Sequence, residues 1–424
     1  MRNYNSLFNA DESTILKRGT FWNLVASILN SLMSAFLMFF ITRINGVILA
    51  GIFSYASAIA YQCLSLGAFG VRNFHSSDVR KEFSFSDYIN HRVISSILMY
   101  TLLIYYAFGK GYSLEKAMII FTFGLFKSID AIEDVYHGEY QRNGRLDIGA
   151  KLQSIRYLLS LVVFVIGLWI SHNLIVTCTI AFIASTLIFT IQNRKFITYF
   201  VKEKIHINWK RTMSLMILTM PICISNLINM YVVNAPKYAI DRNLSSEFQA
   251  YYGYLVMPVF TINLLSTVIY RPYISKMAEN WQNDEIKNFN KQLIKQIIII
   301  VVLTILITLF GYLLGLTLIE VLYGVKLHKY MMHFLILLLG GGLNTIAVFL
   351  SIVMTIQRDQ NKIIIGYIVA LFFSVFCSDF LIQKFHIMGA SLLYFITSLL
   401  LTVIFVLVIL IRYYNKIKLF QEGK

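Results

Sequence analysis

Long apolar runs separated by short polar connections dominate the sequence. Each run has about 17 to 25 residues and is bounded by charged or turn-forming residues. Such a run crosses the hydrocarbon core of a bilayer as one helix, and the two-residue alternation of barrel strands is absent. The pattern predicts an all-α integral membrane protein with about twelve transmembrane helices. The runs are 19–42, 46–69, 93–109, 117–136, 152–171, 173–192, 213–235, 251–270, 296–317, 330–354, 363–382 and 389–411.

Composition supports this class and excludes several others. Of the 424 residues, 58% are hydrophobic, 15% aromatic and only 14% charged, whereas soluble proteins average about 45–50% apolar and about 25% charged residues. A water-soluble enzyme is therefore excluded. The sequence contains no P-loop, HExxH or GxSxG motif, so we assign no catalytic residues, metal site or cofactor. The four cysteines lie inside apolar runs without CxxC spacing and are interpreted as buried hydrophobic residues.

The distribution of Lys and Arg predicts the orientation in the membrane. With a cytoplasmic amino terminus, 27 of the 37 basic residues fall on the cytoplasmic side and 8 on the outer side. The positive-inside rule then places both termini in the cytoplasm, together with the long connections 71–92, 193–212 and 271–295. Because membrane insertion alone produces this asymmetry, the net charge of +16 does not indicate a nucleic-acid partner.

The chain also shows an internal repeat. A shift of 199 residues places Arg43, Tyr55 and Arg72 on Arg242, Tyr254 and Arg271, and 28–30 on 227–229. All four prolines lie between residues 221 and 272, and Pro236 is expected to interrupt the seventh span. These features predict a duplicated unit with an amino-terminal six-helix lobe, 1–212, and a carboxy-terminal lobe, 213–424; the alternative is chance similarity between two apolar sequences.

The fourth span carries the densest ionisable residues. Lys127, Asp130, Asp134 and His137 recur at spacings of three and four, and Glu133 lies at the edge of the same helix face. A charge at the bilayer centre costs about 2.5–3.5 kcal/mol, so this face must meet a partner or water. Two interpretations stay open. The residues form structural ion pairs such as Lys127 with Asp130, or they line an aqueous cavity in which the acids bind protons or cations.

Other spans contain isolated polar residues. Asn226, Asn229 and Lys237 share one face of the seventh span and are interpreted either as a second cavity wall or as hydrogen-bonding contacts between helices. Asp379 is the single acid of the eleventh span and is a candidate proton site or an interfacial residue. Three consecutive glycines, 340–342, favour close helix packing.

Three local strings, 46–55, 251–258 and 270–275, together with the twelve spans and the repeat, resemble a known family. They are similar to the polysaccharide-exporter branch of the multidrug/oligosaccharidyl-lipid/polysaccharide superfamily, specifically the Wzx-type flippases. This resemblance implies two six-helix lobes around a central cationic cavity with alternating access. It also implies outward movement of undecaprenyl-pyrophosphate-linked O-antigen or capsule units across the bacterial inner membrane.

The resemblance implies roles for the polar residues. Lys127 and Lys237 are candidates for the pyrophosphate headgroup. The other candidate substrate contacts are Asn226, Asn229, Arg72 and Arg271, although each arginine also fits a lipid-interface position. The candidate sites for coupling to H⁺ or Na⁺ are Asp130, Glu133, Asp134 and Asp379. The expected partners are the lipid-linked oligosaccharide, membrane lipids, a polysaccharide polymerase and a chain-length regulator.

Three alternatives to a flippase are considered. A multidrug antiporter of the same superfamily would suit the acidic face of the fourth span. A membrane polymerase or glycosyltransferase would need a long external loop, which the predicted topology lacks. The third alternative is a lipid-binding scaffold that transports nothing.

Overall fold

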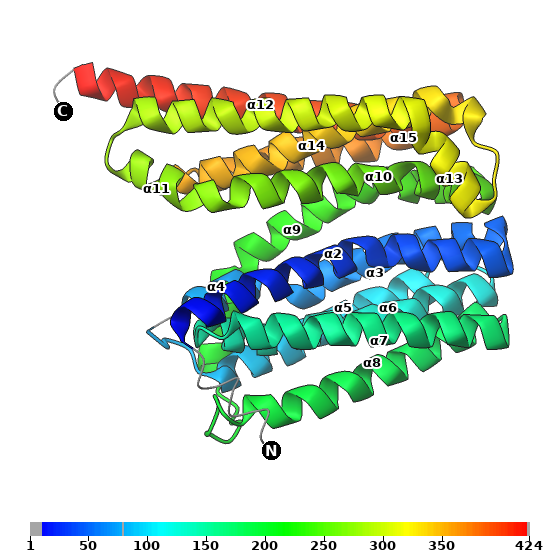
Figure 1. The fold of residues 1–424 in the computed structure, drawn as a ribbon, viewed down its shortest axis with the longest axis horizontal. Helices are drawn as coiled ribbons and strands as arrows, with labels where there is room; N and C mark the ends of the chain where they lie inside the picture. The colour runs from blue at the N-terminus through cyan, green and yellow to red at the C-terminus, as the bar shows by residue number, and fades with distance from the viewer. Residues whose placement is uncertain (1–10, 79, 422–424) are drawn as a thin grey trace. The chain divides into compact units, whose positions relative to one another are not determined.

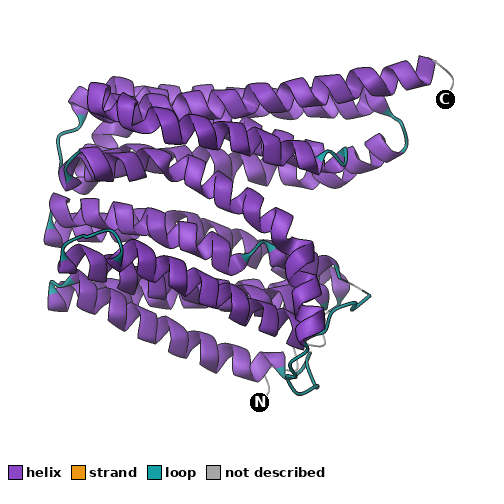
Figure 2. Ribbon diagram, turned by 180° about the vertical axis from the view of Figure 1, so that it is seen from behind, coloured by secondary structure: helices purple, strands orange, loops and turns teal. Residues whose placement is uncertain are grey.

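The computed structural model describes residues 11–78 and 80–421, and every regular element in this part of the chain is helical (Figure 2). Both chain ends, which are expected in the cytoplasm, lie outside the described residues. The first helices are α2 (Glu12–Asn45), α3 (Val47–Ala68), α4 (Val71–Ser77), α5 (Phe85–Phe108), α6 (Leu114–Arg142), α7 (Leu146–Ser171), α8 (Leu174–Ile197) and α9 (Trp209–Asn243).

The remaining elements begin directly after α9. They are α10 (Ser246–Tyr270), the 3₁₀ turn η1 (Arg271–Tyr273), α11 (Ile274–Gln282), α12 (Ile286–Phe310), the π-helical turn η2 (Gly311–Gly315), α13 (Leu316–Tyr323), η3 (His328–Tyr330), α14 (Met331–Ile356) and α15 (Gln360–Gln421). His386, with φ 53° and ψ −127°, is not helical, so α15 consists of two helices joined at a kink.

The all-α membrane fold is confirmed. Within the described residues, 10 helical segments are long and apolar enough to cross a membrane. The helix α6 is not among them because its ionisable residues lower its hydropathy, and α15 counts as one segment despite its kink. With α6 and the two parts of α15 counted separately, the helices match the twelve predicted runs.

Contacts divide the chain into two compact units, Met1–Met230 and Tyr231–Lys424. The division lies inside α9, not at the polar connection before that helix, where the sequence placed the lobe boundary. The first part of α9 packs on the first unit because Gly70 leaves room for Ile222. The Gln62 side chain also donates a hydrogen bond of 3.1 Å to the Leu227 carbonyl.

The expected interruption at Pro236 is wrong. The helix α9 is continuous from Trp209 to Asn243 and passes through both Pro221 and Pro236. A proline removes one backbone donor and leaves the carbonyl four residues earlier without its helical partner. A transmembrane helix tolerates this loss where neighbouring groups or water satisfy the freed carbonyl.

In the first unit, α6 packs against α3, α5, α7 and α8 (Figure 1). Small residues permit the close approach of these helices. A side chain at Gly67 of α3 would collide with Met99 of α5, and one at Gly149 of α7 would lie 2.0 Å from His137 Cδ2. The helix that carries most of the intramembrane charge is therefore the packing centre of its unit.

In the second unit, α14 contacts α10, α12 and α15 (Figure 1). The three glycines of α14 face different neighbours: Gly340 faces α15, Gly341 lies against Val259 of α10, and Gly342 lies against Thr304 of α12. The interpretation of these glycines as packing residues is confirmed, because a methyl group at Gly341 or Gly342 would lie 2.4 Å from a side chain of the neighbouring helix.

One helix start in each unit agrees with the 199-residue shift found in the sequence. The helices α3 and α10 begin at Val47 and Ser246, which are separated by the same 199-residue shift. Tyr55 of α3 contacts Tyr112, with ring centroids 5.8 Å apart. Its counterpart Tyr254 of α10 contacts Tyr323 at 4.3 Å. One helix start therefore recurs at the 199-residue shift, and the equivalent tyrosines each contact another tyrosine, although Tyr112 and Tyr323 are not related by this shift.

We predict that Gly149→Ala lowers the free energy of unfolding by about 1–3 kcal/mol, because the new methyl group collides with the buried His137 ring. The matched control is Gly167→Ala in the same helix, where the nearest atom would lie 3.7 Å away. That change should be neutral or stabilising by up to about 1 kcal/mol. Thermal unfolding of both variants in detergent provides the measurement, and equal melting temperatures would contradict the prediction.

Candidate functional site

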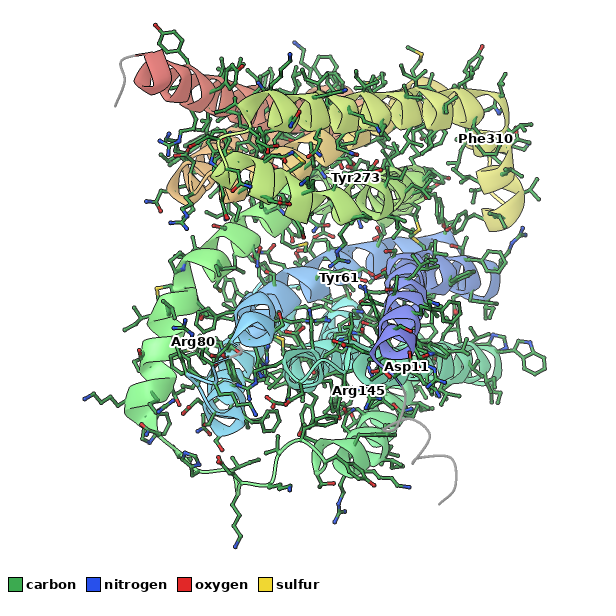
Figure 3. The ribbon with its side chains drawn as sticks, turned by 60° about the vertical axis from the view of Figure 1, so that its left-hand side comes forward. Asp11, Tyr61, Arg80, Arg145, Tyr273 and Phe310 are labelled. Carbon is green, nitrogen blue, oxygen red and sulfur yellow. The ribbon has the colours of Figure 1, made fainter. Side chains whose placement is uncertain are left out.

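The first part of the candidate site is an ion pair inside α6. The Lys127 ammonium and the Asp130 carboxylate are one helical turn apart and in direct contact, and their side chains are only 3% and 10% exposed. Two tyrosine rings flank the ammonium, Tyr61 of α3 at 5.0 Å and Tyr157 of α7 at 5.8 Å. Figure 3 labels Tyr61 on its helix. The structure thus contains the Lys127–Asp130 pair expected from helical spacing.

Arg156 of α7 joins this pair to a second carboxylate. One of its terminal nitrogens lies 2.6 Å from Asp130 Oδ1 and 2.7 Å from Glu133 Oε2. The other donates a 2.9 Å hydrogen bond to the Ser185 hydroxyl of α8. We call the group of four charged residues the Arg156 cluster; its members are Lys127, Asp130, Glu133 and Arg156.

The Arg156 cluster contains two cations and two carboxylates, so it is neutral when all four groups are ionised. Charges removed from water cost several kcal/mol each, and close pairing with hydrogen bonds offsets this cost. The Arg156 side chain is 1% exposed and the Lys127 side chain 3% exposed. The cluster holds α6, α7 and α8 together, and its cations are already engaged with carboxylates.

Asp134 belongs to a separate group. Its carboxylate lies 3.1 Å from Arg92 of α5 and 3.6 Å from Arg72 of α4. Arg92 also donates to the Gly67 carbonyl of α3. Two arginines thus face one carboxylate, and this group has a surplus of positive charge. The carboxylates of α6 therefore have partners on different helices. Asp130 and Glu133 pair with Arg156 of α7, whereas Asp134 pairs with arginines of α4 and α5.

Two histidines lie near the same end of α6. His137 is 1% exposed, and neither of its ring nitrogens has a hydrogen-bond partner among the described residues. The Nε2 atom of His75 in α4 lies 2.9 Å from Glu139 Oε2. The His75 ring stacks on the Tyr88 ring, with the ring centroids 3.7 Å apart. Burial lowers the pKa of the His75 imidazole, and this effect outweighs the nearby Glu139 carboxylate, which raises it.

The sequence assigned no role to several of these partners. They are Arg92, Arg156, His75 and Glu139. One signal was available for Arg156, because a single charge in the fifth span must have a partner within the protein. No comparable signal marks Arg92, which precedes the predicted third span and was counted as part of a polar connection.

The candidates in α9 are distributed over both units. Asn226 is exposed and Asn229 is half-buried, and both belong to the first unit. Lys237 is half-buried in the second unit, and we find no ion pair for it among the described residues of that unit. Lys127 and Lys237 therefore belong to different units. Their convergence on a shared cavity stays a prediction.

Two further candidates lie in the second unit. Asp379 is not isolated: its carboxylate lies 2.9 Å from an Arg242 nitrogen and accepts a 2.7 Å hydrogen bond from the Asn243 amide. The side chains of Arg242 and Asp379 are 46% and 45% exposed, so this pair joins the ends of two helices at an exposed position. Arg271 is exposed in η1, directly after α10.

The described residues contain no group of three or more His, Cys, Asp or Glu side chains arranged to hold a metal ion. Cys63, Cys178 and Cys223 are free and buried, as expected, and Cys377 is free and half-buried.

Comparison with known proteins supports a transporter fold. No family model matches the chain. The chain is 22% identical over 372 residues to the capsular polysaccharide biosynthesis protein CapF of Staphylococcus aureus. The aligned region covers 87% of this chain and 92% of CapF. The similarity therefore extends through both units.

Solved structures of transporters match almost the whole chain. The Vibrio cholerae MATE transporter VcmN in its bent form has a TM-score of 0.61 at 14% identity, covering 95% of this chain and 98% of VcmN. A MOP-superfamily transporter from Pyrococcus furiosus has a TM-score of 0.60 at 11% identity, covering 99% and 98%. The chain has the fold of the MOP-superfamily transporters. The resemblance noted from the sequence is confirmed at this level.

We predict that Arg156→Leu lowers the free energy of unfolding by about 3–5 kcal/mol, because it leaves two buried carboxylates with one cation. The additional change Glu133→Gln should recover part of the loss by removing one unpaired charge. As a matched control, Arg242→Leu breaks a half-exposed pair and should cost less than about 1 kcal/mol. Melting temperatures of the three variants test this order, and similar losses for both arginines would contradict it.

Proposed function

We propose that this protein is a flippase for polyprenyl-pyrophosphate-linked oligosaccharides, which moves a capsule or O-antigen repeat unit from the cytoplasmic to the outer leaflet of a bacterial inner membrane. The observation that carries the proposal is the near full-length similarity to CapF, a capsular polysaccharide biosynthesis protein, in a chain with a transporter fold. This combination favours transport of a polysaccharide precursor over synthesis of one.

The chemistry of such a substrate explains why charged helices are needed. A bare pyrophosphate in hydrocarbon meets a cost of tens of kcal/mol, whereas a hydrated path with basic side chains removes most of it. The polyprenyl tail stays in the lipid throughout. An inside-negative potential favours outward movement of each negative charge by about 2.3 kcal/mol per 100 mV.

In this proposal, the Arg156 cluster couples proton binding to headgroup binding. Lys127 and Arg156 are held by Asp130 and Glu133, so a pyrophosphate oxygen must replace a carboxylate oxygen. Protonation of Asp130 neutralises the carboxylate that contacts both cations, which frees Lys127 for the substrate and leaves Arg156 paired with Glu133 alone. Loss of that proton restores the ion pairs and displaces the headgroup.

Other candidates extend this path in the proposal. Arg72 and Arg92 both face the Asp134 carboxylate, which leaves a surplus of positive charge there. Arg72 thereby contributes to the attraction of an anionic headgroup. Lys237, Asn226, Asn229 and Arg271 are further substrate contacts, and Asp379 is a further coupling site. Both termini are cytoplasmic, and the expected partners are a polysaccharide polymerase and a chain-length regulator.

A multidrug antiporter is the second candidate, because the matching folds include MATE multidrug transporters. The pairing of the α6 acids weighs against it. Asp130 and Glu133 contact Arg156, and Asp134 contacts Arg92, so none of the three is an unoccupied site for an organic cation. Uptake of a hydrophobic cation into proteoliposomes, driven by a proton gradient, would favour the antiporter.

We predict that deletion of the gene causes single repeat units linked to undecaprenyl to accumulate in the cytoplasmic leaflet, with loss of surface polysaccharide. Lys127→Gln should reduce export at least about tenfold, because it removes a charge-assisted contact to the headgroup. Lys110→Gln, which changes an exposed lysine in the connection before α6, is the control and should restore export. Surface polysaccharide and lipid-linked units are measured in the complemented strains, with membrane protein levels checked by immunoblot.

A double variant separates a transport role of the Lys127–Asp130 pair from a structural role. Lys127→Gln with Asp130→Asn removes both members of the buried pair and leaves no uncompensated charge between them. If Lys127 only stabilises α6, this variant restores export. Continued loss of export at normal protein levels shows that the pair acts in transport, in headgroup binding by Lys127 or in coupling by Asp130, and normal surface polysaccharide in the deletion strain would refute the proposed function.

A further inference from the structure

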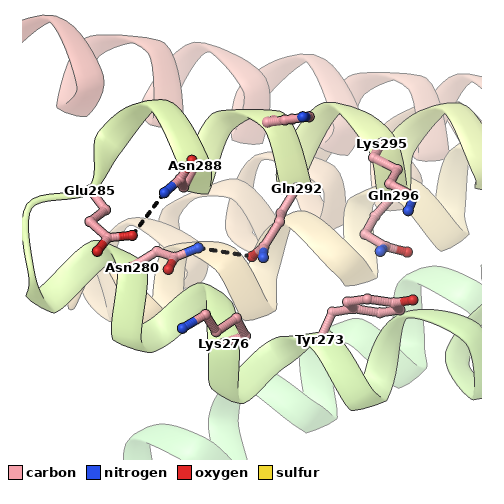
Figure 4. Close-up of a pocket in the computed structure, with 9 residues that line it drawn as sticks. Tyr273, Lys276, Asn280, Glu285, Asn288, Gln292, Lys295 and Gln296 are labelled. Carbon is pink, nitrogen blue, oxygen red and sulfur yellow. Dashed lines mark hydrogen bonds between the residues drawn. The ribbon is translucent and has the colours of Figure 1, made fainter.

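A cavity of about 430 Å³, lined by charged and amide residues and one tyrosine, lies in the second unit between η1–α11 and the first turns of α12 (Figure 4). Its volume is in the range of small-molecule sites in proteins. None of the candidate residues assigned above lines it. It therefore constitutes a separate feature of the molecule.

The walls of the cavity are held by contacts between the two helices. Met277 and Trp281 are the buried residues on the apolar face of α11, and the Trp281 ring lies 5.0 Å from Phe289 of α12. The Asn280 amide donates a 3.2 Å hydrogen bond to Gln292 across the same gap. These contacts leave the polar face of α11 directed along the cavity, as Figure 4 shows for Asn280.

The lining is rich in cations. It includes Lys276, Lys291 and Lys295, against a single lining carboxylate, Glu285. Lys276 forms an exposed pair with Glu279, which is not part of the lining. Among the described residues, Lys291 and Lys295 have no carboxylate partner, and Lys295 lies 5.9 Å from the Tyr273 ring centroid. The lining therefore carries a surplus of positive charge.

A buried amide provides an independent indication of a ligand. Gln296 is 1% exposed, and neither its amide nitrogen nor its amide oxygen has a hydrogen-bond partner among the described residues. Figure 4 shows this amide on the side of α12 that faces Tyr273, inside the cavity lining. An unpaired buried amide is costly, so its position in this cavity indicates a ligand that donates to it or accepts from it.

The surroundings favour a lipid as the source of that ligand. Ile294 and Ile298 are 56% and 55% exposed on α12, next to the cavity lysines in sequence. Exposed apolar residues on a transmembrane helix face acyl chains, and tyrosine at a helix end is typical of the membrane interface. A molecule with its head in the cavity can therefore extend its chains along α12.

We propose that this cavity binds the phosphate group of an anionic lipid headgroup. Lys291 and Lys295 neutralise the phosphate, and Gln296 pairs with an ester oxygen or a headgroup hydroxyl. Glu285 accepts a 2.8 Å hydrogen bond from Asn288 and disfavours a second anionic group at that end of the cavity. The proposal concerns binding alone and does not rest on the proposed transport function.

The test uses the purified full-length protein in a non-ionic detergent with three probes. They are dioctanoyl phosphatidylglycerol, zwitterionic dioctanoyl phosphatidylcholine and inorganic phosphate. Native mass spectrometry measures the bound probe, and the melting temperature measures stabilisation. Phosphatidylglycerol should bind and raise the melting temperature, while phosphatidylcholine and inorganic phosphate at the same concentration should not.

Two variants locate the binding. Lys291→Gln with Lys295→Gln should weaken phosphatidylglycerol binding at least about tenfold. The charge-matched control, Lys326→Gln with Lys384→Gln, changes exposed lysines away from the cavity lining and should leave binding unchanged. Gln296→Leu should weaken binding while raising the melting temperature of the lipid-free protein, because it removes an unpaired buried amide.

The remaining outcomes would overturn the proposal. Equal binding of phosphatidylcholine would show that the cavity does not recognise negative charge. Binding of inorganic phosphate as strong as that of phosphatidylglycerol would assign the cavity to a soluble phosphate instead of a lipid. Unchanged phosphatidylglycerol binding by both the Lys291/Lys295 and the Gln296 variants would place the lipid elsewhere.

Discussion

Charge placed in the interior of a membrane helix bundle needs a partner of opposite sign, and the pairing of Arg156 with Asp130 and Glu133 meets this need in the first unit. The helix α6 packs against α3, α5, α7 and α8. A helix with this many ionisable residues could not occupy the packing centre if its carboxylates were unpaired. The position of α6, and with it the arrangement of the first unit, therefore depends on cations supplied by α7, α5 and α4.

The same pairing limits what the charges can do. Because Lys127 contacts Asp130 and Arg156 contacts two carboxylates, neither an anionic nor a cationic ligand meets an unoccupied site in the cluster. Any ligand must compete with an existing ion pair. A proton on a carboxylate weakens the ion pair with which an anion competes, and this geometry is the basis of the proposed link between proton and headgroup binding.

The second unit distributes its polar residues differently. Its packing helix α14 is apolar and uses three glycines to approach its neighbours closely. Its charges gather at helix ends, in the Arg242–Asp379 pair and in the lysines around the α11–α12 cavity. At these positions water and lipid headgroups solvate the charge, and strict pairing is not required. The two units thus differ in where they carry charge, although α3 and α10 begin 199 residues apart.

The sequence by itself determined the membrane class and the positions of the twelve spans, because a bilayer requires apolar helices of nearly constant length. It did not determine where helices end: α5 begins at Phe85 and α12 at Ile286, since polar turns continue a helix beyond the hydrocarbon. Only the tertiary structure decided the ion pairs between helices. Helical spacing predicts Lys127 with Asp130, but Arg156 meets Asp130 across 26 residues and Arg242 meets Asp379 across 137. The packing of helix faces against one another determines these partners, and the periodicity of residues along a single helix does not predict that packing.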